Sequence, residues 1–193
     1  MNYIATDIEG VYILEPQLFK DARGYFTETY NKADFDKNIG YDVQFIQDNQ
    51  SMSSKGVLRG LHYQEGADSQ AKLVRVINGT VLDVAVDLRK HSPTFGKYLM
   101  VELSAENMRQ LFIPRGFAHG FSVLSEKAII QYKCDNFYAP EADSGISIKD
   151  ESFGIDWKIP TENAILSEKD IKHLCLKDFD SPFDYNMNLY PEF

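Results

Sequence analysis

Short β-rich runs follow one another through most of the chain, and this succession restricts the fold more than any other feature. Residues 72–88 read KLVRVINGTVLDVAVDL, two such runs on either side of Asn78-Gly79. Because Asn-Gly suits a type I′ turn, the pattern predicts a hairpin here. The runs KYLMVEL, RQLFIP, HGFSVLS and KAIIQYKC follow. Strands spaced this closely, with little helix between them, indicate a β-sandwich or barrel from about Gly10 to Ser147.

Little helix is expected elsewhere in the 193 residues, which suit a single domain. A short helix is predicted at Lys32–Lys37. In the C-terminal third, PTENAILSEKDIKHLCLKDF predicts extended chain followed by a helix that begins near Ser167. Residues 183–193 are aromatic and irregular, and are expected to pack as a tail.

Composition argues against several classes of partner. The net charge of −9 and the pI near 4.9 disfavour nucleic acid. No apolar run approaches the roughly 20 residues that a membrane helix needs, and MNYIATDIEG lacks the features of a signal peptide. The two cysteines, Cys134 and Cys175, form no disulfide framework, so a reduced cytoplasmic protein is expected. An anionic small substrate would need cations concentrated in one pocket.

The segment VLRGLHYQ places an arginine and a histidine in an apolar, strand-like run. In a regular strand Arg59 and His62 would face opposite sides of the sheet. Gly60 lies between them, and a bulge there would bring both side chains to one face. We therefore predict that strand regularity breaks at Gly60.

Two polar blocks resemble the motifs of the cupin superfamily, a jelly-roll β-barrel. The first runs from Gly56 to His62 and Gln64, and the second is Pro114-x-Gly116-x-x-His119. Metal-binding cupins use His-x-His, a Glu and the second-motif His as ligands. Here Gln64 replaces one histidine and Lys72 is the nearest inward candidate for the Glu. Lysine offers donors only and is repelled by a divalent ion, so no metal is expected at this set.

Acid–base and anion-binding groups take the place of metal ligands. An arginine fork suits phosphate, while a His, a Lys and a Tyr in one pocket suit proton abstraction next to a carbonyl. The residues that supply these groups around the barrel mouth are Arg59, His62, Lys72, His119 and Tyr132, with Arg23, Glu28, Gln47, Asp48 and Asn49 upstream.

Longer motifs closely resemble the dTDP-4-dehydrorhamnose 3,5-epimerase family, cofactor-free cupins. They are DARGYFTETY, FIQDNQSMSSKGVLRGLHYQ, AKLVRVINGTVLDVAVDLR, FIPRGFAHGF and the pair Tyr132 and Tyr138, within a match from about Ile4 to Asp170. The resemblance implies a mainly β, cupin jelly-roll barrel with a few short helices and a helical or irregular C-terminal segment. It also implies inversion of C3 and C5 of dTDP-4-keto-6-deoxyglucose, in the pathway to dTDP-L-rhamnose.

The resemblance assigns a role to each matched residue. His62 would be the general base, Asp170 would orient it, Lys72 would stabilise the enolate, and Tyr132 would be the acid on the opposite face. The remaining matches would bind substrate: Arg23, Arg59, Gln47 and Asn49 the diphosphate and nucleotide, Glu28 the base, Tyr138 and Phe19 the thymine by stacking, and His119, Asp143 and Lys169 further parts of the ligand. Asp143 departs from the longer Glu expected there in many members, so its carboxylate reaches less far toward the ligand.

The family is dimeric, and its N-terminal strands are exchanged between subunits. The resemblance therefore implies a homodimer in which residues 1–30 cross to the partner, so that Arg23 and Glu28 reach the partner's site. Residues 178–193 would be an individual C-terminal tail.

Simpler interpretations stay open for single residues and for the whole chain. Arg59 could be a strand-edge arginine, Lys72 a solvated strand end, and Tyr132 and Tyr138 packing residues. Ser167-x-x-Asp170 fits a capping box. Three alternative functions stay open. They are an epimerase of only C3 or only C5 of another nucleotide-linked 4-keto-6-deoxy sugar, a metal-dependent cupin oxygenase or isomerase, and a non-catalytic sugar-nucleotide binder.

Overall fold

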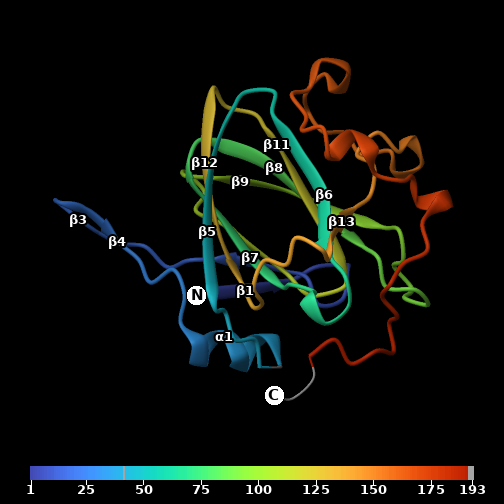
Figure 1. The fold of residues 1–193 in the computed structure, drawn as a ribbon. Helices are drawn as coiled ribbons and strands as arrows, with labels where there is room; N and C mark the ends of the chain where they lie inside the picture. Colours follow the sequence, from blue (N-terminus) through green and yellow to red (C-terminus); the bar gives the residue numbers. More distant parts are fainter. Residues whose placement is uncertain (41, 191–193) are drawn as a thin grey trace.

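Two antiparallel sheets face each other in the computed structural model, which describes residues 1–40 and 42–190 (Figure 1). The six-stranded sheet has the order β1 (Asn2–Ala5), β2 (Tyr12–Glu15), β10 (Gln110–Ile113), β7 (Lys72–Asn78), β12 (Lys127–Cys134) and β5 (Gln47–Ser54). The five-stranded sheet has the order β13 (Asp143–Gly145), β6 (Leu58–Gln64), β11 (Phe117–Val123), β8 (Thr80–Asp87) and β9 (Tyr98–Ser104). This mainly β, jelly-roll architecture is the predicted fold class.

The predicted hairpin at 72–88 is wrong, although both strands exist. β7 pairs with β10 and β12, whereas β8 pairs with β11 and β9, so the turn crosses from one sheet to the other. A type I′ turn requires a positive φ at both of its central residues. Gly79 meets this condition with a φ of 81°, but Asn78 does not have a positive φ. Apolar side chains of both strands, Val74, Val76, Val81 and Ala85, lie in the core between the sheets.

Apolar side chains fill three layers, and alternation along each strand decides which layer a residue enters. The first layer lies between the sheets and includes Val74, Val81 and Phe121. The second covers the outer face of the five-stranded sheet and includes Leu58, Leu61, Tyr63, Trp157 and Phe183. The third lies under the single α-helix of the described residues and includes Leu14, Phe35 and Phe112.

The helix α1 spans Lys32–Ile39, so the predicted helix at Lys32–Lys37 is confirmed and slightly longer. The Asn31 side chain caps its start by accepting from the backbone of Asp34, and Gly40 ends it in a left-handed conformation. The hairpin β3 (Phe19–Asp21) and β4 (Gly24–Phe26) precedes the helix and projects away from the sheets (Figure 1).

The C-terminal segment covers the outer side of β6 and β13 without the predicted helix near Ser167. Only a 3₁₀ turn, η4 (Asp170–Lys172), forms there. Helix propagation stops because the chain becomes extended at Leu174, whose backbone pairs with Ile146 and Ser147. The other 3₁₀ turns are η1 (Gly66–Asp68), η2 (Glu151–Phe153), η3 (Thr161–Asn163) and η5 (Leu176–Asp178).

The tail packs as predicted over 183–190, while 191–193 lie outside the described residues. Phe183 is buried, and the Tyr190 hydroxyl accepts a hydrogen bond from the backbone N–H of Arg115. Both cysteines are free thiols. Over the described ranges, no helix combines the length and apolar character that a membrane span requires.

Candidate active site

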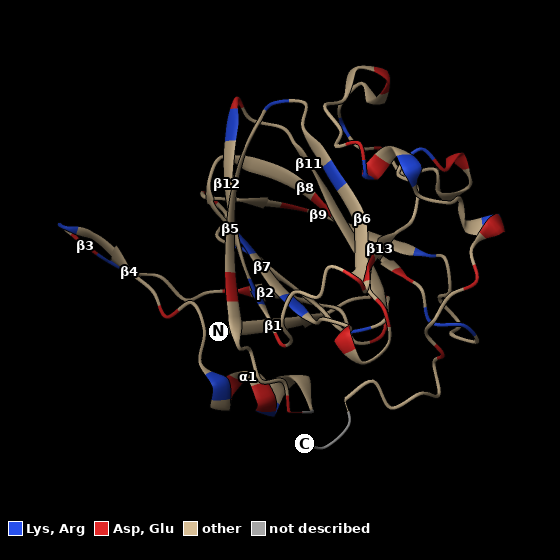
Figure 2. Ribbon diagram, in the orientation of Figure 1, with Lys and Arg blue, Asp and Glu red and all other residues tan. Residues whose placement is uncertain are grey.

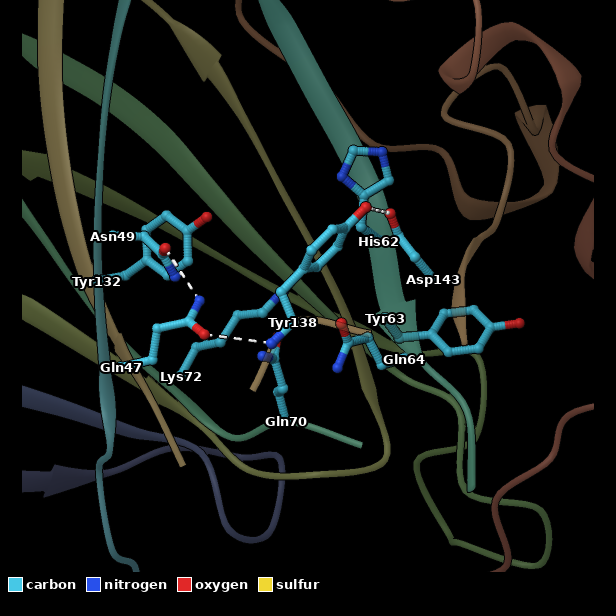
Figure 3. Close-up of a pocket in the computed structure, with 10 residues that line it drawn as sticks. All are labelled: Gln47, Asn49, His62, Tyr63, Gln64, Gln70, Lys72, Tyr132, Tyr138 and Asp143. Carbon is cyan, nitrogen blue, oxygen red and sulfur yellow. Dashed lines mark hydrogen bonds between the residues drawn. The ribbon is translucent and has the colours of Figure 1, made fainter. Parts of the chain in front are cut away.

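A pocket of about 280 Å³ lies between the two sheets (Figure 3). Side chains from β5 and β12 form one wall, and side chains from β6 form the other. Its lining consists of Gln47, Asn49, His62, Tyr63, Gln64, Gln70, Lys72, Tyr132, Tyr138 and Asp143. Most of these residues are polar, so the pocket suits a polar ligand that needs several specific contacts.

A bulge at Gly60 turns His62 toward this pocket, as predicted. Opposite β11, His62 pairs with His119 and Arg59 pairs with Phe121, so two residues of β6 lie against the single residue Gly120. Gly60 has a φ of 125°, and a Cβ there would lie 2.5 Å from the Gly120 Cα. Because one extra residue separates them, Arg59 and His62 face the same side, while Leu58 and Leu61 both join the outer layer.

Asp170 binds the His62 ring from the C-terminal segment. The His62 Nε2 lies 2.5 Å from the Asp170 Oδ1. The other carboxylate oxygen, Oδ2, accepts from the Ser167 hydroxyl at 2.7 Å and from the Ser167 backbone at 3.1 Å. Asp170 therefore makes the capping contact with Ser167 and the contact with His62 together. Burial raises the pKa of Asp170, but hydrogen bonds from His62 and Ser167 outweigh it and lower that pKa to about 2.

Only Nε2 of His62 is engaged by Asp170. Within the described residues the other ring nitrogen, Nδ1, has no hydrogen bond. With the Nε2 proton donated to the carboxylate, Nδ1 keeps a lone pair. That lone pair is free to accept a proton from a ligand in the pocket.

Lys72 and Tyr132 enter the same pocket from the opposite sheet, on β7 and β12. Burial lowers the pKa of Lys72, and nearby acidic groups, led by Cys134, offset this only in part. Burial raises the pKa of Tyr132, so its hydroxyl holds its proton at neutral pH. The pocket thus places a proton acceptor on one wall and two proton-bearing groups on the other.

A chain of polar contacts links the residues at the pocket mouth. The Tyr138 hydroxyl donates to the Asp143 Oδ2 at 2.9 Å (Figure 3). Lys169 forms an ion pair with the same oxygen. The Gln47 Oε1 accepts from the Tyr138 backbone N–H. The shorter carboxylate at Asp143 therefore still lies at the mouth, held between a tyrosine and a lysine.

Gln64 orients the loop that carries Tyr138. Its Nε2 donates to the carbonyls of Asp68 and Phe137, and its Oε1 accepts from the backbone of Ala139. Both polar atoms of the Gln64 amide are engaged in these hydrogen bonds, so neither is available to coordinate a metal ion. With the cation Lys72 on the facing strand, the residues at the metal positions of other cupins do not fit a metal ion.

Some predicted ligand-binding residues lie elsewhere. Successive side chains along a strand point to opposite faces of the sheet. Asp48 therefore projects from the face of β5 that is opposite to the one carrying Gln47 and Asn49, and it forms an ion pair with Lys133. His119 faces inward but is buried, with its Nε2 at 3.0 Å from the Asp83 carboxylate, and it does not line the pocket.

Arg59 lies further along β6, where its Nε donates to the Ser53 Oγ. Arg59 does not line the pocket. Its charge acts to lower the pKa of Tyr132, but the larger effect of burial raises that pKa. Phe19, Arg23 and Glu28 belong to the projecting β3–β4 arm or to the chain that follows it, and none of them lines this pocket.

Three lining residues were not predicted from the sequence, and neither was one residue that lies beside the pocket. Tyr63, Gln64 and Gln70 line the pocket, and Gln70 could have been found because it precedes Lys72 by two residues. The neighbour is His173, whose ring centroid lies 5.8 Å from that of His62. Its position three residues after Asp170 was the only sequence signal for it.

The chain is similar to known proteins over most of its length. The family model described as dTDP-4-dehydrorhamnose 3,5-epimerase matches residues 5–178. A dTDP-4-dehydrorhamnose 3,5-epimerase of Escherichia coli is 56% identical over 178 residues, covering 92% of this chain and 96% of the relative.

Solved structures show the same architecture. The dTDP-4-dehydrorhamnose 3,5-epimerase of Elizabethkingia anophelis aligns with a TM-score of 0.89 at 53% identity, over 92% of this chain and 97% of the other. The epimerase of Legionella pneumophila, in complex with dTDP-4-keto-L-rhamnose, aligns with a TM-score of 0.90 at 46% identity, over 94% and 97%. The chain therefore belongs to the dTDP-4-dehydrorhamnose 3,5-epimerase family.

Proposed function

We propose that this enzyme inverts C3 and C5 of dTDP-4-dehydro-6-deoxy-D-glucose and so produces dTDP-4-dehydro-L-rhamnose. One observation carries the proposal: the His62–Asp170 pair faces Lys72 and Tyr132 across a single pocket. The hydrogens on C3 and C5 are acidic because each carbon adjoins the 4-ketone. A base on one side and an acid on the other is the arrangement that inversion of such a carbon needs.

His62 is the base in this proposal. Its Nδ1 takes the proton from the carbon next to the ketone, and the C–H electron pair moves into the enolate. The Asp170 carboxylate accepts from Nε2, fixes the tautomer and stabilises the imidazolium that forms. Because the pKa of Asp170 is lowered to about 2, the carboxylate is ionised at every pH at which the enzyme is expected to work.

Lys72 and Tyr132 complete the reaction from the facing sheet. The Lys72 ammonium binds the 4-keto oxygen and stabilises the negative charge that develops there. The Tyr132 hydroxyl then delivers a proton to the opposite face of the carbon. Each inversion thus removes one proton and returns another, so the step needs no redox partner.

Substrate binding is assigned to the polar groups around the base and to the arm. Gln47 and Asn49 line the pocket, and Tyr138 at its mouth offers a ring for stacking on the thymine. Arg59, at the next position on the same face of β6, is the phosphate-binding cation of this protomer. Asp143 and Lys169 hold Tyr138 in place or contact the ligand, and the free thiols suit a reduced cytoplasm.

We also propose a homodimer in which the β3–β4 arm crosses to the partner. The arm exposes large apolar side chains, with Phe19 54%, Tyr25 58% and Phe26 70% accessible. An arm of this kind is unfavourable in water unless another surface covers it. Crossing would bring Arg23 and Glu28 to a pocket that they do not reach within their own protomer.

The decisive experiment is incubation with dTDP-4-dehydro-6-deoxy-D-glucose in D₂O, followed by NMR. Deuterium is expected at both C3 and C5, with inverted configuration at each. Exchange at one carbon only would identify a single-centre epimerase, and no exchange at either would identify a binding protein. Stoichiometric iron or zinc required for turnover would contradict the proposed mechanism.

A further inference from the structure

Three metal-ligating side chains meet where the C-terminal segment covers His62. A ring nitrogen of His62, a ring nitrogen of His173 and a carboxylate oxygen of Asp170 all lie within 4.8 Å of one another. The two imidazole rings are in edge contact, with an interplanar angle of 71°. This group shares only His62 with the positions that hold metal in other cupins.

His173 is held in this position by close packing and has an unused nitrogen. A Cβ at Gly145 would lie 2.6 Å from the His173 Nε2, so the absence of a side chain on β13 makes room for the ring. The Nε2 atom is buried, and within the described residues it has no hydrogen-bond partner. A buried polar atom without a partner is costly, and a bound cation would satisfy it.

Two imidazoles and one carboxylate form a favourable ligand set for zinc, which enzymes bind through His₂-carboxylate triads. The Asp170 carboxylate accepts a hydrogen bond from the Ser167 hydroxyl, which fixes its orientation. Residues around metal sites hold the ligand side chains in the same way. Zinc–ligand bonds of about 2.0–2.1 Å place donor atoms roughly 3.3 Å apart. The His62 Nε2 and the Asp170 Oδ1 lie 2.5 Å apart, so they must separate by about 0.8 Å to admit the ion, while the His173 ring turns toward them.

We propose that His62, Asp170 and His173 form an inhibitory site for Zn²⁺ or a similar divalent ion. The ion takes the place of the proton between the His62 Nε2 and the Asp170 Oδ1. Coordination uses the Nε2 lone pair, so the imidazole proton moves to Nδ1. Nδ1 then carries a hydrogen and cannot accept one, which removes the base from the pocket without blocking the pocket itself.

The binding of the ion rests on the geometry alone, whereas the loss of turnover rests on the role proposed for His62. The test therefore measures both separately. The metal-free full chain, prepared with EDTA and then freed of it, is titrated with CoCl₂ while visible absorbance reports on coordination. Turnover and deuterium exchange are measured in parallel with ZnCl₂.

His173→Phe is the informative variant because it keeps a ring in the space beside Gly145 but offers no ligand atom, and His173→Ala repeats the test if phenylalanine disturbs folding. His91→Ala is the matched control, since His91 forms an exposed histidine–aspartate pair with Asp184 on the surface. We expect zinc to inhibit the wild type and the His91 variant equally, and to be released by EDTA. The His173 variants should keep zinc-free turnover and need about tenfold to a hundredfold more zinc, the range by which metal affinity falls when even an outer partner is lost.

Three results would overturn the proposal. They are absence of one-to-one cobalt binding to the wild type, equal zinc sensitivity in the His173 variants, and loss of zinc sensitivity in the His91 variant. Cobalt binding that leaves turnover and exchange intact would refute the inhibitory effect and would also remove His62 from its role as base. Failure of deuterium exchange without any metal would instead refute the proposed function.

Discussion

Lys72 combines an unfavourable burial with the enolate-stabilising role that we propose for it. Taking the ammonium out of water lowers its pKa from 10.5, which means that the folded protein binds this proton less tightly than the unfolded chain does. The folded state is therefore penalised while Lys72 is charged. The penalty is fully present below the lowered pKa and disappears as the pH rises through that value to 10.5.

Replacing Lys72 with methionine should separate function from stability. Lys72→Met removes the ammonium that is proposed to stabilise the enolate, so turnover should be lost. The same change should raise the free energy of unfolding at pH 7 by about 1 kcal/mol, a gain common for a single stabilising replacement. Urea unfolding from pH 7 to 11 is the measurement, and the gain should shrink at the alkaline end. A less stable variant at pH 7 would show that Lys72 makes stabilising contacts.

Tyr132 should matter for one carbon more than for the other. The hydroxyl has no hydrogen bond within the described residues, so Tyr132→Phe should leave the fold stable. Loss of a general acid typically costs about 10²–10⁴-fold in rate. We expect this loss at C5, with much smaller loss of exchange at C3, in the same D₂O assay. Equal losses at both carbons would contradict the assignment of Tyr132 to the C5 step.

At the scale of elements, the bulge in β6 is the feature on which the site depends. Gly60→Ala would place a methyl group 2.5 Å from the Gly120 Cα and 2.8 Å from the His119 carbonyl. We expect a loss of roughly 3 kcal/mol or more, because neither backbone can give way, together with loss of turnover.

Gly56→Ala is the matched control for this change. Gly56 also has a positive φ, 80°, but no atom lies within 4 Å of its added Cβ. Its substitution should cost only the conformational penalty of about 1 kcal/mol. Urea unfolding of both variants separates the two effects. Equal costs would mean that the contact with β11 is not what requires glycine at 60.

Local sequence patterns predicted individual elements better than their partners. The break at Gly60 followed from the parity of Arg59 and His62, and a short helix was predicted at Lys32–Lys37, where α1 forms. Asn78-Gly79 specified a turn but could not specify that its two strands enter different sheets, because long-range packing decides pairing. The helix expected near Ser167 was lost for a similar reason, since a bridge to Ile146, directly after β13, extends the chain at Leu174.

At the scale of the whole molecule, the candidate site joins residues that are distant in sequence. The resemblance to a family predicted His62, Lys72, Tyr132, Asp170 and Tyr138, and the structure brings them together. Single-residue patterns could not place Asp48 on the outer face or bury His119 against Asp83, because both depend on strand register. The arm is a different case, because it projects away from the sheets (Figure 2) and we propose that its residues reach the pocket of a second subunit.

Mixed dimers can test whether the arm crosses between subunits. A His62→Ala protomer has no base, and an Arg23→Ala, Glu28→Ala protomer has a defective arm, so each homodimer should be inactive. In a mixed dimer with exchanged arms, the arm-defective protomer keeps its own His62 and receives an intact arm from its partner. That single complete site should restore about half of the wild-type activity per dimer, as expected for one of two independent sites.

The control for this experiment is a mixture of His62→Ala with Lys72→Ala. Both changes lie in the same pocket of the same protomer. No mixed dimer of this pair contains a complete site whether or not the arms cross, so activity should stay absent. Differently tagged subunits, co-expressed and purified through both tags, give defined mixed dimers for the assay. If the first pair also stays inactive although its dimers form, the arm serves its own protomer, and Arg23 and Glu28 must reach their own pocket by folding back.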